Sequence, residues 1–250
     1  MDRNKFSAIA HRDHAFCNPI SESKINTIIN LTKMTPDDKA IDIGAGTSEL
    51  LIRYIEKYNI LATAIELYDG SIETARNRAN GRISLDRIQF VNEDAKQVMD
   101  NYSTPEFRLG ICVGSTHAVG DLAATLQALR KCVHPGGYIL VGEGYWKKTP
   151  PVEYLQALGA QLEDLKTHHG NVKLGEQLGL TPLYSVVASE DDWDAYEGLY
   201  ASSIENYCYE NPNDPDVEAM LTRIRSWRNT YLEWGRDTLG FGLYLFRNGY

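Results

Sequence analysis

The 250-residue sequence contains no long hydrophobic run, no cysteine pair of the CxxC type, no internal repeat and no low-complexity tract. No apolar stretch approaches the roughly 18 residues that a membrane span needs, and the first residues hold no apolar signal core. The four cysteines, Cys17, Cys112, Cys132 and Cys208, are scattered, which argues against a disulfide framework. We therefore expect a reduced, soluble, cytoplasmic protein with no membrane partner.

Positive charge is also scarce. Twenty-five Lys and Arg face 34 Asp and Glu, for a net charge of −9, which disfavours binding of nucleic acid through bulk charge. The hydrophobic share of 43% and the charged share of 24% are ordinary for a folded soluble chain. A chain of this length buries roughly 70–75% of its extended surface on folding, so it needs no disulfides or metal ions to stabilise its core. We expect one domain over residues 1–250.

Short β-branched runs alternate with helical patterns, which is typical of a parallel sheet covered on both faces. Apolar stripes predict one helix over residues 50–58 and another from 122 to 133, which stops at the His134-Pro135-Gly136-Gly137 turn. The fold class is therefore α/β, with a doubly wound, seven-stranded, mostly parallel sheet. The predicted strands are 39–43, 60–65, 88–91, 109–113, 137–141, 184–188 and 241–246.

Two segments lie outside this alternation. Residues 1–37 are expected to form an N-terminal cap segment, with a helix that follows Ser21. Residues 190–236 are expected to form a helical lid inserted before the last strand. The second half of the lid has a clear helical pattern, and the run 211–215, with two prolines, is its break.

The lid segment is unusually acidic and aromatic. Between Asp191 and Asp216 it holds eight acids and no Lys or Arg, interleaved with Trp193, Tyr196, Tyr200, Tyr207 and Tyr209. Aromatic rings with carboxylates can hold a cation or an amine. Such a face is also typical of an ordinary solvated helix, so both interpretations stay open.

A glycine-rich turn follows the first predicted strand. It reads Asp42-Ile43-Gly44-Ala45-Gly46-Thr47-Ser48-Glu49 and leads at once into a helix, which lets a ligand approach the backbone and the helix N-terminus. Glu49 stands where a dinucleotide fingerprint needs a small residue, which counts against a nicotinamide cofactor. Asp42 instead suits a ligand that carries an ammonium group, and Glu66, which ends the second strand, suits ribose hydroxyls.

The order D-x-G-x-G, an acid that ends strand two, Asp94-Ala95 after strand three and Pro135-Gly136-Gly137 before strand five resembles the class I S-adenosylmethionine-dependent methyltransferases, which have a Rossmann-like fold. The resemblance covers about residues 38–142. Further segments, among them Gly142-Glu143-Gly144-Tyr145-Trp146, are similar to a poorly characterised bacterial group of these enzymes. The chain departs from the family pattern at Ser48, which replaces the usual third glycine, and at Arg108, which replaces an acid early in strand four.

The resemblance implies a set of residues that bind S-adenosyl-L-methionine and its product S-adenosyl-L-homocysteine. These cofactor residues are His14, Asn18, Asp42, Gly44, Ala45, Gly46, Glu66, Leu67, Asp94, Ala95 and Val113. Asp94 has a second expected role as a helix N-cap. His11, His14 and Cys17 recur at the spacing of a metal-ligand helix face, but no fourth ligand lies near them, and we expect no metal.

The acceptor is expected beyond the carboxyl ends of strands four and five. His117 and Glu143 are the candidate proton acceptors, because both could be poised by partial burial. The remaining acceptor-site candidates are Ser115, Thr116, Tyr145, Trp146 and Tyr196.

Several functions remain open at this point. The leading one is methyl transfer to a small-molecule acceptor, since the chain lacks the (D/N)-P-P-(Y/F) sequence that would hold a base amino group after strand four. A protein methyltransferase and a non-catalytic module that binds S-adenosylmethionine are the alternatives. A nicotinamide-linked oxidoreductase is disfavoured by Glu49.

Overall fold

The β-branched runs form one seven-stranded sheet in which the fourth strand is central and the first strand lies next to it. A computed structural model describes residues 1–249, and its strand order is β3-β2-β1-β4-β5-β7-β6. The pairs β1–β2, β1–β4, β2–β3 and β4–β5 are parallel, and β6–β7 is antiparallel. The strands are β1 (Lys39–Ile43), β2 (Leu61–Ile65), β3 (Ile88–Val91), β4 (Phe107–Val113), β5 (Val133–Trp146), β6 (Leu180–Val187) and β7 (Leu239–Asn248).

Helices occupy most of the connections between these strands. The α-helices are α1 (Arg3–Ala10), α2 (Glu22–Leu31), α3 (Glu49–Tyr58), α4 (Asp69–Ala79), α5 (Ala95–Val98), α6 (Leu122–Cys132), α7 (Val152–Leu158), α8 (His168–Gln177), α9 (Glu190–Glu210), α10 (Val217–Thr230) and α11 (Arg236–Thr238). Short 3₁₀ turns are η1 (Leu85–Arg87), η2 (Met99–Tyr102), η3 (Thr116–Ala118) and η4 (Leu162–Asp164), and η5 (Tyr231–Gly235) is a π-helical turn.

The chain divides into two compact units, which are described separately. Unit 1 comprises residues 1–20, 144–168 and 188–241, and unit 2 comprises residues 21–143, 169–187 and 242–250. The predicted organisation as a single domain over 1–250, with 1–37 as a cap and 190–236 as a lid, stays a prediction.

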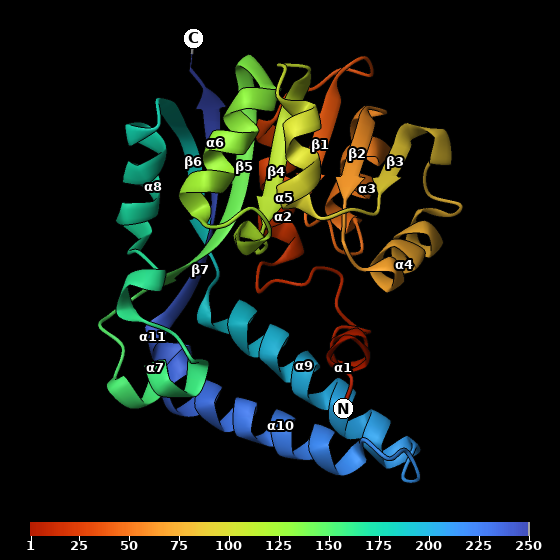
Figure 1. Ribbon diagram of the computed structural model, residues 1–250, viewed down its shortest axis with the longest axis vertical. Coiled ribbons are helices and arrows are strands. Elements are labelled where there is room, and N and C mark those ends of the chain that lie inside the picture. Colours follow the sequence, from red (N-terminus) through yellow and green to blue (C-terminus); the bar gives the residue numbers. More distant parts are fainter. Residues whose placement is uncertain (250) are drawn as a thin grey trace. The chain divides into compact units, whose positions relative to one another are not determined.

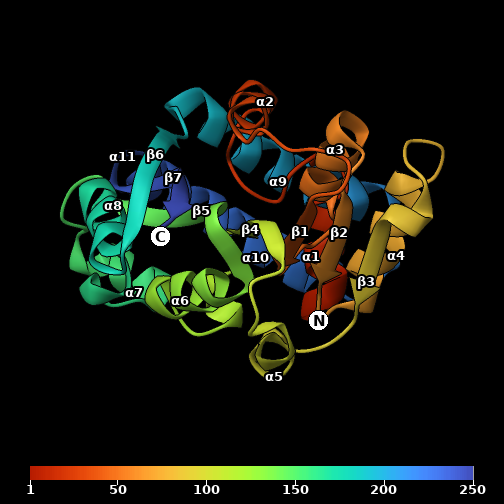
Figure 2. The same ribbon diagram turned by 90° about the horizontal axis from the view of Figure 1, so that it is seen from above.

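Unit 2 is the layered part of the fold. In Figure 2, α2 and α3 lie on one face of the sheet, and α5, α6 and α8 lie on the other. The second face is closed by one apolar cluster that includes Ile41, Val98, Leu126, Leu129 and Phe246, all of them almost fully buried. The amphipathic stripe of α6 thus faces the sheet, as its period predicts.

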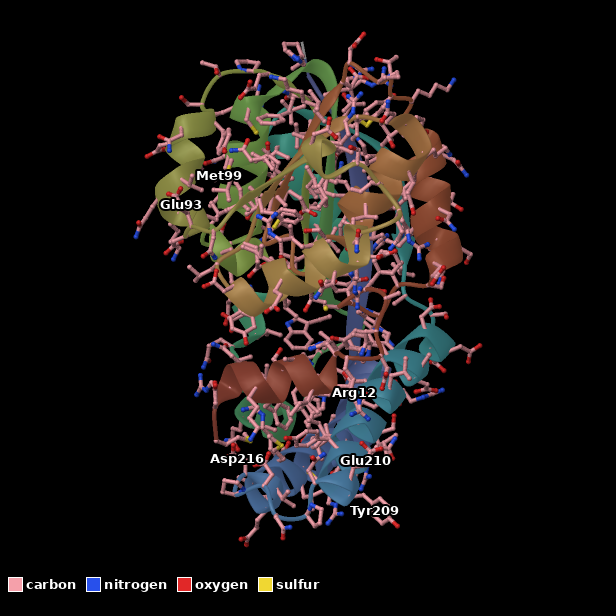
Figure 3. The ribbon with its side chains drawn as sticks, turned by 90° about the vertical axis from the view of Figure 1, so that its right-hand side faces the viewer. Arg12, Glu93, Met99, Tyr209, Glu210 and Asp216 are labelled. Atoms are coloured by element: carbon pink, nitrogen blue, oxygen red, sulfur yellow. The ribbon has the colours of Figure 1, made fainter. Side chains whose placement is uncertain are left out.

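Unit 1 is built around a helical hairpin. Helices α9 and α10 run side by side in opposite directions, and α1 packs on α9 (Figures 1 and 3). Its own apolar cluster joins Phe6 and Ala10 of α1 to Ile204 of α9 and to Met220 and Ile224 of α10. Arg12, which follows α1, and Glu210 at the end of α9 are labelled in Figure 3 and form an ion pair of 3.9 Å.

The structure differs from the sequence-based expectation at the edges of elements. Helix α6 ends at Cys132 and β5 begins at the next residue, so the His134–Gly137 turn lies inside a strand. The pairing of β4 with β5 jumps from Phe107↔Val133 to Leu109↔Tyr138, which lets these residues bulge out opposite Arg108. The guanidinium of Arg108 donates to the Gly136 carbonyl at 3.0 Å, so this departure from the family pattern stabilises the bulge. The first half of the inserted segment, α9, is one unbroken helix of 21 residues.

A buried carboxylate joins two segments of unit 2. Glu49, the first residue of α3, is 7% exposed and accepts hydrogen bonds from Arg53 Nε at 2.8 Å and from Arg82 Nη1 at 2.8 Å. Burial raises the pKa of Glu49, but the hydrogen bonds from Arg82 and Arg53 outweigh it, so the net shift is downward. Arg82 also pairs with Glu56, whose side chain is far more exposed. Glu49 is therefore a structural anion that ties α3 to the chain after α4.

We expect Glu49→Gln to lower the free energy of unfolding at neutral pH by about 1–3 kcal/mol, because it leaves two guanidinium groups without their buried partner. A lowered folded-state pKa means that the stabilisation is present above the ordinary carboxyl pKa and is lost as pH falls through the folded value. The deficit should therefore shrink towards about pH 4. Urea unfolding at both pH values measures it. Glu56→Gln, a matched control at the exposed partner, should cost less than about 1 kcal/mol; equal losses for the two variants would contradict this account.

Candidate cofactor and acceptor site

The turn between β1 and α3 is held in the left-handed backbone region. Gly44 and Gly46 have φ values of 66° and 54°, and Ser48 has a φ of 56°. A Cβ at position 44 would lie 2.4 Å from the Cβ of Ser115, so only glycine lets this turn meet the loop after β4. Ser48, which stands in place of the usual third glycine, holds this left-handed conformation at a cost of about 1–2 kcal/mol.

Glu66 connects this turn to the end of β2. Its carboxylate accepts a hydrogen bond from the Gly46 N–H at 2.8 Å and another from the Tyr68 N–H at 2.9 Å. The Ala45 N–H donates to the Ile65 carbonyl at 3.0 Å. Each carboxylate oxygen keeps a lone pair beyond these bonds. Glu66 is therefore fixed in place with acceptor capacity to spare.

Asp42 is a buried acid of unit 2 whose pKa is strongly raised. It is 4% exposed, and burial, followed by the negative charge of Glu66, raises the pKa of Asp42 to about 8. A buried carboxyl in this state favours a ligand that brings positive charge, since a cation would offset the cost of ionising it. The chemistry of this pair fits an ammonium-bearing nucleoside such as S-adenosylmethionine.

The end of β3 completes this edge of the sheet. The side-chain amide of Asn92 donates to the carbonyls of Glu66 at 3.1 Å and Leu67 at 3.0 Å, a bond that the sequence did not predict. Asp94 caps α5 by accepting from the Lys96 N–H at 2.9 Å, as expected, and Ala95 behind it is buried. Leu67 is 68% exposed, so it presents an apolar surface at the end of β2.

The loops after β4 and β5 meet through side chains. The Ser115 hydroxyl donates to the Gly44 carbonyl at 3.3 Å, and the Thr116 hydroxyl donates to Glu143 Oε2 at 2.5 Å. Glu143 is half-buried, as anticipated, whereas His117 lies exposed in η3, so the expected partial burial of this histidine is wrong. Val113 is the last residue of β4, the strand that pairs in parallel with β1.

The remaining predicted site residues belong to unit 1. His14 is buried, and its Nε2 donates to the Tyr196 carbonyl at 2.9 Å while its ring packs on that of Tyr196. Asn18 keeps a buried side-chain oxygen for which residues 1–249 supply no hydrogen-bond donor. Asn18 therefore retains the capacity to accept a hydrogen bond from a ligand.

Tyr145 and Trp146 are both buried in unit 1. The Tyr145 ring covers Gly240, where a Cβ would come within 2.2 Å of it, and lies 5.4 Å from the ring of His168. The Trp146 indole N–H donates to the Leu162 carbonyl at 2.9 Å. These contacts give both side chains a packing role, and their role towards an acceptor stays a prediction.

Unit 1 also contains a pocket of about 460 Å³ that the sequence did not predict. Its walls include Phe6, His11, Tyr196, Glu197, Tyr200 and Trp227. Tyr196 and Tyr200 stand one helical turn apart in the acidic aromatic run, so their shared face was a signal in the sequence. The pairing of this face with Trp227 of α10 depends on tertiary packing, which no local pattern reveals.

The described residues give no indication of a metal. Helix α1 ends at Ala10, so His11, His14 and Cys17 do not share a helix face. Across residues 1–249 no three His, Cys, Asp or Glu side chains are grouped so as to hold a metal ion. Of the helices in this range, none combines the length and the apolar character that crossing a membrane requires.

Comparison with known proteins identifies relatives along the whole chain. Residues 34–197 match the family described as a methyltransferase domain. The uncharacterized protein YjhP of Escherichia coli (strain K12) is 27% identical over 246 residues, which is 98% of each chain.

Two solved structures extend this similarity to the cofactor. An S-adenosylmethionine-dependent methyltransferase of Geobacter sulfurreducens, crystallised with S-adenosyl-L-homocysteine, has a TM-score of 0.86 and 26% identity, with 97% of each chain covered. A second such enzyme, from Thiobacillus denitrificans and with the same ligand, has a TM-score of 0.88 and 26% identity, covering 98% of this chain and 99% of its own. The chain belongs to the methyltransferase-domain family and is an S-adenosylmethionine-dependent enzyme with the Rossmann-like fold of that family.

Proposed function

We propose that this enzyme transfers the methyl group to a small-molecule acceptor. The observation that carries the acceptor class is the aromatic pocket of about 460 Å³ in unit 1, which falls within the range of about 300–1,000 Å³ typical of small-molecule sites. A further relative, named 27-O-demethylrifamycin SV methyltransferase, is 26% identical over 106 residues, 42% of this chain, and its name specifies a small-molecule acceptor. The net charge of −9 agrees with an acceptor other than nucleic acid.

We assign the donor site to the turn after β1 and to the ends of β2 and β3. Asp42 faces the amino group of the donor, and Glu66 accepts from its ribose hydroxyls. Further donor contacts are assigned to Gly44, Ala45, Gly46, Leu67, Asp94, Ala95, Val113, His14 and Asn18. The bound donor supplies a methyl group activated by its sulfonium, so the protein has to position the acceptor and, where the attacking atom carries a proton, to accept that proton.

Glu143 is the proposed proton acceptor, since it is half-buried and its carboxylate is oriented by the Thr116 hydroxyl. His117 is the second candidate, and its exposure in η3 makes it the weaker one. Ser115 and Thr116 are proposed to contact the acceptor from the loop after β4. Tyr145, Trp146 and Tyr196 are retained as acceptor-site candidates of unit 1.

Asp42→Asn should weaken binding of S-adenosylhomocysteine about 10–100-fold, because it removes one charge-assisted hydrogen bond to the amino group. Calorimetry measures the loss. Wild-type binding at neutral pH should also release a proton, since a cation next to Asp42 lowers a pKa that stands at about 8. The binding enthalpy should therefore depend on the ionisation enthalpy of the buffer, and that dependence should vanish in the variant. Asp100→Asn, at an exposed acid of unit 2, is the matched control.

The same variant should alter the pH dependence of stability. Because the folded-state pKa of Asp42 is raised from 3.8 to about 8, the folded chain holds a proton that the unfolded chain has lost in this window. Wild-type stability should fall as pH rises through the window, by up to about 1.4 kcal/mol per pH unit. Asp42→Asn should flatten this dependence of stability on pH. Near pH 8, the variant should therefore melt at a higher temperature than the wild type. Unchanged binding together with an unchanged slope would contradict both roles of Asp42.

Methyl-labelled S-adenosylmethionine should transfer label to a small-molecule fraction of a cell extract and not to its protein fraction. Glu143→Gln should slow this transfer about 10²–10⁴-fold while the affinity for S-adenosylhomocysteine stays within about 2-fold, since the residue acts on the acceptor. Glu106→Gln, at an exposed acid paired with Lys39, is the control. Label in the protein fraction would instead establish a protein methyltransferase. Intact donor binding with no transfer to either fraction would favour a non-catalytic module.

A further inference from the structure

The pocket of unit 1 lies among four helices, α1, α7, α9 and α10. Phe6 comes from α1, His11 follows it, Tyr196 and Glu197 come from α9, and Trp227 comes from α10. Ala157 of α7 is a further wall residue. All of these residues lie within unit 1, so the pocket is a property of that unit alone.

The pocket contains a carboxyl group that is hidden from water. Glu197 is 7% exposed, and one of its oxygens accepts a hydrogen bond from the Trp227 indole N–H at 2.7 Å. Burial raises the pKa of Glu197 to about 7, and the indole bond offsets only part of that effect. An ionised carboxylate in such a place is costly unless a cation pairs with it.

Two pocket walls can carry positive charge, His11 and Arg223, and in the described part of the chain neither forms an ion pair with Glu197. His11 donates from Nδ1 to the Ser7 carbonyl at 2.9 Å, so its Nε2 accepts from the Tyr196 hydroxyl at 3.0 Å. Burial lowers the pKa of His11, which keeps the ring neutral. Arg223 lines the pocket as well, but its guanidinium lies over the Phe6 ring, 4.7 Å from the ring centroid, and Glu197 has no electrostatic partner of opposite charge among residues 1–249. The charge of Glu197 is therefore left for a ligand to neutralise.

Several other walls are aromatic faces suited to the same ligand. Tyr196 and Tyr200 stack with their ring centroids 6.3 Å apart, and the Tyr200 ring lies 6.1 Å from that of Phe6. The negative ring faces attract a desolvated cation, and indole does so most strongly. A carboxylate surrounded by such faces discriminates a charged amine from a neutral molecule of the same shape.

We propose that the pocket of unit 1 binds a protonated organic amine, with the ammonium group on Glu197 and the carbon skeleton against Tyr196, Tyr200 and Trp227. An ammonium N–H donates to the oxygen of Glu197 that the Trp227 indole does not occupy. The inference deepens the proposed function and rests on it where the amine is the methyl acceptor, since the same pocket supports the small-molecule acceptor; binding of the amine itself is independent of methyl transfer.

Calorimetric titration with benzylamine and benzyl alcohol tests this pocket, because the two probes share size and ring and differ in charge. The full-length protein should bind benzylamine at least about 10-fold more tightly than benzyl alcohol. E197Q should reduce this preference to about 2-fold or less, while E205Q, on the same helix and paired with Arg225 outside the pocket, should retain it. Trp227→Leu, at a partly exposed wall, should weaken benzylamine binding and so locate the site.

Equal affinity for the two probes, a preference that survives E197Q, or no binding of benzylamine would each overturn the proposal. The comparison of probes on the wild-type protein needs no variant, so it decides the matter even where E197Q fails to fold. Titration of the same proteins with S-adenosylhomocysteine separates this inference from the donor assignment. If S-adenosylhomocysteine binds and benzylamine does not, the amine pocket is wrong and the donor assignment stands. The reverse result would contradict the donor assignment alone.

Discussion

The close approach of two loop backbones at the centre of the sheet is the constraint on which the donor site depends. Gly44 leaves room for Ser115, whose hydroxyl then bonds to the Gly44 carbonyl. These loops follow β1 and β4, the neighbouring strands from which the chain order runs outward in opposite directions. In open α/β sheets ligands bind at such a reversal, beyond the carboxyl ends of the strands. A side chain at position 44 would push these two loops apart and displace the acids that flank them.

The acids of this region have different roles, because each has different hydrogen-bond and charge partners. Glu66 holds the turn by accepting two backbone N–H groups, and Asp42 is buried next to its charge. Glu49 lies only a few residues along the same turn but is paired with two arginines. The charge of Glu49 is neutralised by Arg53 and Arg82, so the feature that disfavours a dinucleotide is the size of this side chain at a position that needs a small residue.

Local patterns predicted what local physics decides. Strands 39–43 and 88–91 have the predicted bounds, because their β-branched runs end at clear turn residues. The start of β5 was misplaced, since pairing with Phe107 extends the strand ahead of a Pro-Gly-Gly sequence that normally marks a turn. The left-handed conformation of Ser48 and the Trp227–Glu197 bond escaped prediction for a similar reason. The backbone conformation of Ser48 is imposed by the surrounding fold, and the Trp227–Glu197 bond joins residues that are distant in sequence.

Asp42 in unit 2 and Glu197 in unit 1 are both buried carboxyl groups that lower the stability of the folded protein at neutral pH. In both cases burial raises the pKa of a carboxyl, so the ligand-free protein loses stability at neutral pH in order to keep an acid away from water. A core that needed only packing would place an apolar side chain at either position, at no such cost. The cost is offset when a cation arrives, because the same low polarity that penalises a lone carboxylate strengthens its attraction to an ammonium group. Burial of an acid without a cationic partner is therefore the feature by which both proposed sites would link stability to the charge of a ligand.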